Sequence, residues 1–203
     1  MTVNSSPDDG DLWTRARAGG RDAFAELFDR HANTIYSYCF RRTAEWSLAE
    51  DLTSVVFLEA WRKRHAVELA EDKVLPWLFG IATNVVRSHR RARRRYEGAL
   101  KRLPPPERQL DVAEELVQRI DDERQMRDIL EVLERVLPRL EQEAFALCAW
   151  QGLSSHEASL ALGVPEATVR TRLFRARARL RDLTQSASGG VDGVSVRKDA
   201  HES

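Results

Sequence analysis

Arginine side chains form two dense blocks in this sequence, and they are the residues best equipped to do chemistry. The first block comprises Arg87, Arg90, Arg91, Arg93, Arg94, Arg95, Lys101 and Arg102. The second comprises Arg170, Arg172, Arg175, Arg177, Arg179 and Arg181. A guanidinium group binds phosphate and guanine through a planar, bidentate fork. Because residues 107–134 between the blocks are acidic, the pattern indicates two polyanion-binding surfaces, although solvated helix faces would carry the same charges.

The second block lies in a segment that is typical of a helix-turn-helix, Gly152 to Leu180. The pattern predicts a short helix over 155–162, a turn at Gly163 and a second helix from Pro165. The apolar stripe that should face inward on this second helix comprises Val169, Leu173, Ala176 and Leu180. In a DNA-binding helix-turn-helix the second helix enters the major groove, so its outward face is the candidate base reader.

That outward face carries four residues that we predict to contact DNA: Arg170, Thr171, Phe174 and Arg175. A phenylalanine on a solvated face is unfavourable unless a partner covers it. A thymine methyl or the sugar edge of DNA would cover Phe174, with Thr171 and Arg175 beside it. The alternative is an ordinary amphipathic helix whose Phe174 packs on a neighbouring domain.

Residue types that serve catalysis or metal binding are scattered. None of the five histidines pairs with a cysteine or a carboxylate at the spacing of metal ligands. The sequence contains no glycine-rich phosphate loop and no nucleophile elbow. These patterns predict that the protein is not an enzyme and that it uses no metal and no cofactor.

Composition and cysteine placement limit the compartment. The 203 residues include 32 basic and 32 acidic side chains, so the formal net charge is zero and indicates no partner. Cys39 and Cys148 lie in apolar helical segments and indicate small buried side chains in a reducing compartment. No apolar run approaches the roughly 18 residues of a membrane helix, and residues 1–11 lack a signal-peptide core. We therefore expect a cytoplasmic protein without membrane insertion.

Helical periodicity is strong along the chain, and strand signals are nearly absent. In the first half, helices are expected over Asp22–Arg42, over Ser47–Lys63 and from Pro76 to about Arg95. Ser47 suits an N-cap, because Glu50 follows three residues later as a capping box requires. The stretch before Pro76 has mixed charge and indicates a loop or a broken helix.

The second half is separated from the first by the three prolines at 104–106, which stop helical structure. Apolar periodicity resumes near Met126, Pro138 interrupts it, and a further helix is expected over Glu141–Trp150. The predicted fold class is all-α, with two small helical domains at 12–103 and 124–184 joined by a flexible acidic linker at 104–123. The second domain contains the helix-turn-helix, and the polar ends at 1–11 and 185–203 are predicted to be disordered.

Four stretches together resemble bacterial RNA polymerase sigma factors, in the extracytoplasmic-function (ECF) class of the sigma-70 family. The first two are AFAELFDRHANTIYSYCFRR at 23–42 and AEDLTSVVFLEAWR at 49–62, which look like the family's first and second conserved helices. The third is PWLFGIATNVVRSHRRARRR at 76–95, which looks like the helix that reads and opens the promoter. The fourth, at 137–180, is similar to the family's final domain. The resemblance covers both predicted domains in order.

This resemblance implies a division of labour between the domains. The domain at 12–103 would be region 2, which binds core RNA polymerase and recognises and melts the −10 element. The domain at 124–184 would be region 4, whose four outward residues would recognise the −35 element. The implied partners are core RNA polymerase, promoter DNA and an anti-sigma factor.

Two groups of region 2 residues acquire roles from the resemblance. The second conserved helix has apolar residues nearly all round, so it must be central in its bundle and leave a polar strip for the polymerase. That strip comprises Glu50, Asp51 and Ser54. The candidates for the −10 element are Asn84, Arg87, Arg90, Arg91 and Arg94, and the loop at 64–73 would hold an unstacked base. Trp77 and Phe79 could stack on bases, but we favour a place in the core.

The alternative function is a helix-turn-helix regulator that binds DNA without polymerase and uses the N-terminal helices to dimerise. Run-off transcription with core polymerase distinguishes the two, because only a sigma factor requires the core enzyme for specific binding.

Overall fold

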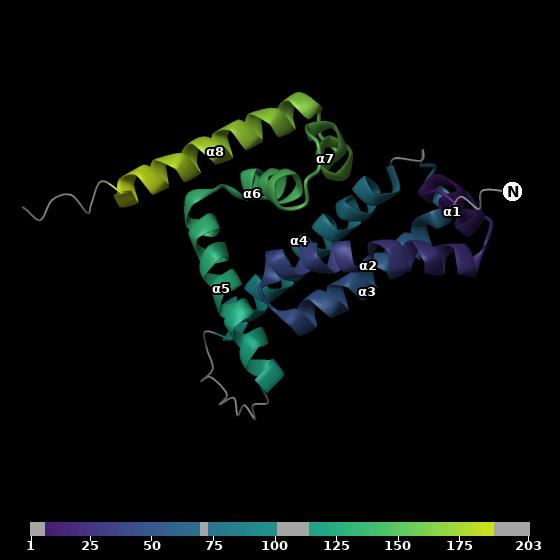
Figure 1. Cartoon of the computed structure of the whole chain (residues 1–203), viewed down its shortest axis with the longest axis horizontal. Coiled ribbons are helices and arrows are strands. Elements are labelled where there is room, and N and C mark those ends of the chain that lie inside the picture. The colour runs from purple at the N-terminus through teal and green to yellow at the C-terminus, as the bar shows by residue number, and fades with distance from the viewer. Residues whose placement is uncertain (1–6, 70–72, 101–113, 189–203) are drawn as a thin grey trace, which may run out of the picture.

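The computed structural model describes residues 7–69, 73–100 and 114–188, and these ranges are helical apart from short turns, without a strand. The first half contains α1 (Asp9–Arg17), α2 (Arg21–Thr43), α3 (Trp46–Lys63), a 3-10 turn (Arg64–Ala66) and α4 (Val74–Leu100). The second half contains α5 (Glu114–Val136), α6 (Arg139–Phe145), a π-helical turn (Ala146–Trp150), α7 (Ser155–Leu162) and α8 (Glu166–Ser188). The predicted all-α class is confirmed (Figure 1). Within the described ranges, no helix has the length and apolarity to cross a membrane.

Helices α1 to α4 pack into a bundle (Figure 1), and aromatic side chains form much of its core. Trp13, Tyr38 and Phe79 are almost completely buried, and the Tyr38 hydroxyl lies 2.9 Å from the Thr83 hydroxyl. The rings of Tyr38 and Phe79 meet edge to face with centroids 5.4 Å apart, a favourable aromatic geometry. Trp77 packs on Trp13 with centroids 4.8 Å apart. The preference for a place in the core is therefore confirmed for Phe79, and it holds in part for Trp77, which is half-buried and packs against the core.

The first turn of α3 is capped from a distant part of the chain. We expected Ser47 to be the N-cap, with Glu50 completing a capping box, and this prediction is wrong. The N-cap is Glu45, whose side chain makes no capping bond. The backbone N–H of Trp46 instead donates to a carboxylate oxygen of Glu123 on α5, at 2.8 Å. A tertiary contact thus satisfies the first amide of a helix that begins one residue before the expected cap.

Helix α5 begins at Glu114, inside the segment 104–123 that we expected to be a linker. Acidic side chains are frequent in its first turns, where negative charge stabilises a helix. Apolar periodicity, which begins near Met126, could not reveal these turns. At the ends, α1 begins at Asp9 and α8 continues to Ser188, so both enter segments that we expected to be disordered. The three prolines at 104–106 lie outside the described residues.

The two cysteines differ in burial. Cys39 is completely buried, and its burial raises the pKa of the thiol to about 12. Cys148 is half-buried, and both thiols are free. The expectation of a buried side chain is confirmed for Cys39 and holds only in part for Cys148.

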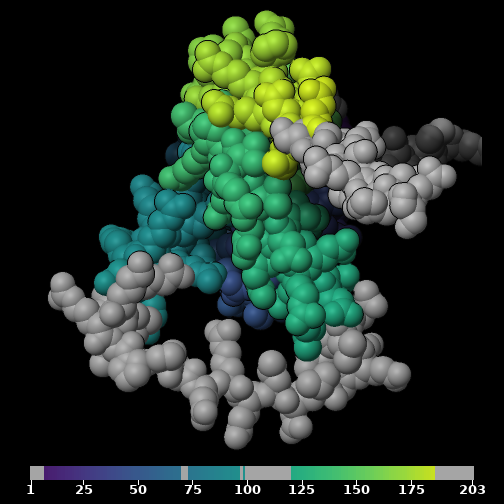
Figure 2. Space-filling model, turned by 90° about the vertical axis from the view of Figure 1, so that its left-hand side faces the viewer, coloured from purple at the N-terminus to yellow at the C-terminus, as the bar shows by residue number. Residues whose placement is uncertain are grey.

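The two halves of the chain pack against each other, chiefly through α4 and α7. One continuous apolar cluster joins Phe79 of the first half to Leu147 and Ala158 of the second. The backbones approach closely at Gly80, where a Cβ atom would lie 2.8 Å from the Ala161 carbonyl oxygen. Only glycine fits such a contact without a shift of the backbone. In the space-filling view, α5 lies across the first-half bundle with α7 and α8 above it (Figure 2).

Candidate nucleic-acid interface

A capping box and two glycines shape the helix-turn-helix. The backbone N–H of Ser154 donates to Glu157 at 2.7 Å, and the N–H of Glu157 donates to the Ser154 hydroxyl at 3.2 Å. Gly163 ends α7 with a φ of +64°, in the left-handed region that glycine tolerates. Gly152, with a φ of +73°, ends the preceding turn in the same way. The predicted helix over 155–162 and the turn at Gly163 are confirmed.

The two faces of α8 have the predicted polarity. Val169, Leu173 and Ala176 are buried, and Leu180 is half-buried. The opposite face exposes all four candidate base readers: Arg170, Thr171, Phe174 and Arg175. Phe174 has 70% of its surface exposed, so no neighbouring helix of the described chain covers it. Because α8 runs along the outer edge of the molecule, this face is open to a large partner (Figure 1).

Ion pairs distinguish the arginines of α8. Arg170 lies 2.9 Å from Glu166 one turn earlier, an exposed pair that contributes little and leaves the side chain adaptable. Arg179 lies 3.2 Å from Glu141 of α6, which is almost completely buried, so Arg179 is tied to the interior of the domain. Arg175 makes no ion pair within the described part of the chain.

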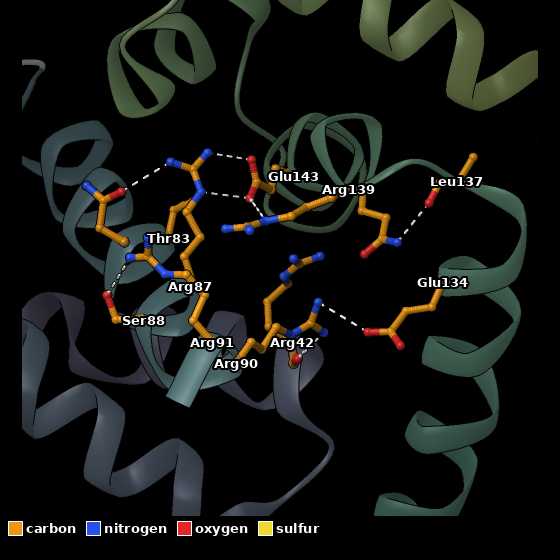
Figure 3. A network of polar contacts seen from close by, with 12 residues as sticks. Arg42, Thr83, Arg87, Ser88, Arg90, Arg91, Glu134, Leu137, Arg139 and Glu143 are labelled. Atoms are coloured by element: carbon orange, nitrogen blue, oxygen red, sulfur yellow. Dashed lines mark hydrogen bonds and ion pairs between the residues drawn. The ribbon is translucent and has the colours of Figure 1, made fainter. Parts of the chain in front are cut away.

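The basic end of α4 is divided between solvent and the second half of the chain (Figure 3). Asn84, Arg91 and Arg94 are exposed, and Arg91 donates to the neighbouring Ser88 hydroxyl at 3.2 Å. The other two −10 candidates, Arg87 and Arg90, are held by carboxylates from α6 and α5. Three of the five candidates are therefore accessible in this arrangement.

Arg87 forms a bidentate ion pair with Glu143 (Figure 3). Its Nε lies 2.7 Å from one carboxylate oxygen, and a terminal nitrogen contacts the other. The Glu143 side chain is completely buried and also accepts from Arg139 at 3.2 Å. Burial opposes ionisation, but the hydrogen bonds from Arg87 and Arg139 hold the pKa of Glu143 below its ordinary value. The hydrogen bond to Glu143 in turn raises the pKa of Arg87. The pair is therefore ionised.

Arg90 spans the junction between α2 and α5. One terminal nitrogen donates to the backbone carbonyl of Arg42 at 2.7 Å, and the other lies 3.2 Å from a Glu134 carboxylate oxygen. Burial lowers the pKa of Arg90 to about 10, and the neighbouring charges of Arg42 and Arg94 act in the same direction.

Helix α3 presents the expected polar strip and, beside it, apolar residues that sequence reasoning missed. Glu50, Asp51 and Ser54 are exposed, while the opposite side of the helix is buried in the bundle. Val55 and Leu58 are 42% and 54% exposed next to this strip. A groove of about 410 Å³ between α3 and α4 includes Val55 in its wall. The exposed surface of α3 therefore combines acidic and apolar contacts.

Sequence reasoning also missed Glu143 and Arg42. A signal for Glu143 existed, because LEQEAFALCAW at 140–150 places an acid among apolar residues of a helix, where it needs a basic partner. Arg42 lies near the charged end of its helix, where the sequence pattern is typical of exposed residues, so nothing in the sequence indicated that it is buried. The loop at 64–73 is described only in part, since residues 70–72 lie outside the described residues.

Comparison with known proteins matches both halves of the chain to family models. The model for sigma-70 region 2 matches residues 27–96, which span α2 to α4. The model for sigma-70 region 4 matches residues 127–180, which include the helix-turn-helix.

Two curated relatives cover most of this chain. The RNA polymerase sigma factor NccH of Alcaligenes xylosoxydans xylosoxydans is 32% identical over 189 residues, which cover 87% of this chain and 94% of NccH. The ECF RNA polymerase sigma factor BldN of Streptomyces coelicolor is 32% identical over 171 residues, which cover 82% of this chain and 62% of BldN. The chain thus spans nearly the whole of one relative and about three fifths of the other.

A solved structure shares the fold. The sigma factor RpoE of Bartonella quintana, in complex with the anti-sigma factor NepR, aligns with a TM-score of 0.58 at 23% identity. The match covers 83% of this chain and 98% of RpoE. At this identity the likeness shows the fold alone.

Proposed function

This chain belongs to the ECF class of the sigma-70 family of RNA polymerase sigma factors, and from that premise we propose which surfaces carry its tasks. As a sigma factor it directs promoter-specific transcription initiation. We assign region 2 to residues 12–103 and region 4 to residues 124–184. In this proposal the protein is a specificity subunit without catalytic activity of its own, and it acts in the cytoplasm with core polymerase and promoter DNA.

The recognition of the −35 element is assigned to the outward face of α8. The observation that carries this assignment is Phe174, an apolar side chain left 70% exposed between Thr171 and Arg175. Sequence-specific DNA contacts of this type pair an arginine with guanine and an apolar group with the thymine methyl. Arg175 and Phe174 offer both kinds of contact on one side of α8, and that side packs against no other helix of the described chain.

The binding of core polymerase is assigned to the exposed surface of α3. Glu50, Asp51 and Ser54 supply its polar part, and Val55 and Leu58 supply apolar area. Stable interfaces combine an apolar centre with a polar rim, and this surface has both. An anti-sigma factor, the class of partner that RpoE binds in its complex with NepR, would compete for the exposed faces of α3 and α8 in this chain.

The −10 element is assigned to the basic end of α4, with Asn84, Arg91 and Arg94 accessible in the described arrangement. Arg87 and Arg90 reach DNA only after they leave Glu143 and Glu134. We infer that the described structure is a closed form and that binding to core polymerase separates α4 from α6 and α5.

Run-off transcription tests this function against the alternative. The purified protein is added to core polymerase and to a library of promoter fragments, and in parallel to the same fragments without polymerase. A sigma factor yields start sites that share −10 and −35 elements only when core enzyme is present. Tight, specific DNA binding in the absence of core enzyme, together with no effect on transcription, would instead identify an autonomous helix-turn-helix regulator.

A further inference from the structure

The cleft where α2, α3, α4 and α5 meet carries more arginine than carboxylate. A cavity of about 300 Å³ opens there, at the lower end of the range for pockets that hold small ligands. Its basic lining comprises Arg42, Arg90, Arg93, Arg94 and Arg127, and its acidic lining comprises Glu45, Glu131 and Glu134. Five guanidinium groups against three carboxylates leave a local excess of positive charge, although the whole chain is neutral.

Arg42 is the residue that requires a partner in this cleft. Only 3% of its surface is exposed, and its buried Nε has no hydrogen-bond partner among the described residues. A buried guanidinium that lacks partners is costly, so buried polar groups of this kind call for a specific explanation. Figure 3 shows the side chain of Arg42 lying beside that of Arg90, in the space between α4 and α5.

The neighbouring Arg90 and Arg93 already form ion pairs with carboxylates of the chain. Glu134 pairs with Arg90 at 3.2 Å, and Glu45 pairs with Arg93 at 2.7 Å. Arg90 is partly buried, and both its burial and the adjacent charge of Arg42 disfavour the charged state of Arg90. The repulsion between these two guanidinium groups is the kind that an anion placed between them would remove.

We propose that this cleft binds a small, multiply charged phosphate anion, with Arg42 as its main ligand and Arg127 contributing from α5. Several guanidinium forks converge on one cavity, and a tetrahedral oxyanion can accept hydrogen bonds from all of them, whereas one carboxylate fills a single fork. The cavity is too small for a nucleic-acid helix, which favours a free anion. Because α2 and α4 belong to one half and α5 to the other, a bound anion stabilises the closed form.

Calorimetric titration of the full chain with sodium pyrophosphate, at constant ionic strength in chloride buffer, tests the proposal. We expect saturable binding of one anion per chain, and a rise in the unfolding temperature that follows the concentration of pyrophosphate. Arg42→Met should weaken binding about tenfold or more, and Arg127→Met should weaken it severalfold. Arg62→Met, which removes a charge from an exposed site on α3, is the matched control and should bind as the wild type does.

A second measurement distinguishes a ligand role for Arg42 from a purely structural one. In chloride buffer without pyrophosphate, Arg42→Met removes a buried charge that forms no ion pair in the described part of the chain, and it should unfold at the wild-type temperature or above it. Wild-type affinity in Arg42→Met, or no saturable binding by the wild type, overturns the proposal. So does competition in which a single-stranded oligonucleotide displaces pyrophosphate and loses affinity in Arg42→Met, since the cleft would then hold the DNA backbone. If Arg42→Met fails to fold, the exposed Arg127 decides, and unchanged affinity in Arg127→Met overturns the proposal.

Discussion

The carboxylate of Glu143 holds the guanidinium of Arg87 across the junction of the two halves, so one member of the candidate −10 surface is a structural partner of region 4. The glutamate is completely buried, and the arginine is about a quarter exposed. A candidate DNA contact is thus occupied within the chain until the halves separate.

Glu143→Gln should weaken the closed form and release Arg87. The amide keeps the shape of the side chain but not its charge, and a hydrogen bond to a charged group is worth about 1.5–3 kcal/mol. We expect the free energy of unfolding to fall by roughly that amount in urea denaturation, and binding to single-stranded −10 DNA to strengthen. Asp128→Asn on the exposed side of α5 is the control. Unchanged stability and DNA binding in Glu143→Gln would contradict a closed form held by this pair.

The same pair should make stability depend on pH in the acid range. The pKa of Glu143 in the fold lies below its ordinary value of 4.5, because its hydrogen bonds to Arg87 and Arg139 outweigh the cost of burial. Its contribution is fully present above pH 4.5 and disappears as the pH falls through the lower folded-state pKa. Urea midpoints of the wild type and Glu143→Gln should therefore differ at pH 7 and converge on acidification. A constant difference at every pH would exclude this ionisation as the cause.

Arg175→Ala should remove sequence preference at the −35 element and leave the −10 preference intact. A bidentate contact between arginine and guanine is worth about 1–3 kcal/mol of discrimination. Arg179→Ala is the matched control, because Arg179 is tied to Glu141 on the inner side of α8. Transcription from a randomised promoter library by each holoenzyme measures both preferences. Unchanged −35 preference in Arg170→Ala, Phe174→Ala and Arg175→Ala alike would remove α8 from the role of base reader.

Leu58→Asp should weaken binding to core polymerase about tenfold or more without unfolding the chain. The side chain is more than half exposed on α3, so its replacement should change stability by no more than about 0.5 kcal/mol. At an interface, however, a buried unpaired charge is strongly unfavourable. Leu160→Asp, at an exposed site on α7, is the control. Competition binding to core enzyme gives the comparison, and equal affinities for the two variants would place the polymerase elsewhere.

Gly80→Ala should separate the halves without touching any candidate DNA contact. The new Cβ would lie 2.8 Å from the Ala161 carbonyl oxygen, and overpacking of this kind costs about 1–3 kcal/mol. Gly98→Ala, also on α4, meets no atom within 4 Å and should favour the helix instead. Small-angle scattering should show a larger radius of gyration for the first variant only. If both variants remain as compact as the wild type, the contact between α4 and α7 does not hold the halves together.

Local patterns predicted the helices and the polarity of α8, because both follow from the period of apolar residues along one segment. The stripe Val169, Leu173 and Ala176 could be read in this way, and so could the exposure of Phe174. Contacts between distant segments could not be read. Ser47 had the right spacing for a cap, yet the acceptor came from Glu123, and the choice between them depends on how α5 packs against α3.

For the candidate site, the sequence predicted which residues share a helix, but it did not predict the contacts between helices. Arg87 and Arg90 were correctly placed on a basic helix, but nothing in the spacing of residues revealed that Glu143 and Glu134 would hold them. Charge pairing across a domain junction is set by the relative orientation of whole helices, which many sequences with the same periodicity would not share. For the same reason the buried Arg42, at the end of α2, had no counterpart among the predicted residues.

The hydrogen bond from the Trp46 amide to Glu123 reports whether the two halves of the chain are in contact. The amide belongs to the first turn of α3, and the acceptor belongs to α5, so separation of the halves leaves this amide to water. Deuterium uptake at this amide would therefore follow the opening equilibrium in the unlabelled native protein, with core enzyme or an anti-sigma factor added in turn.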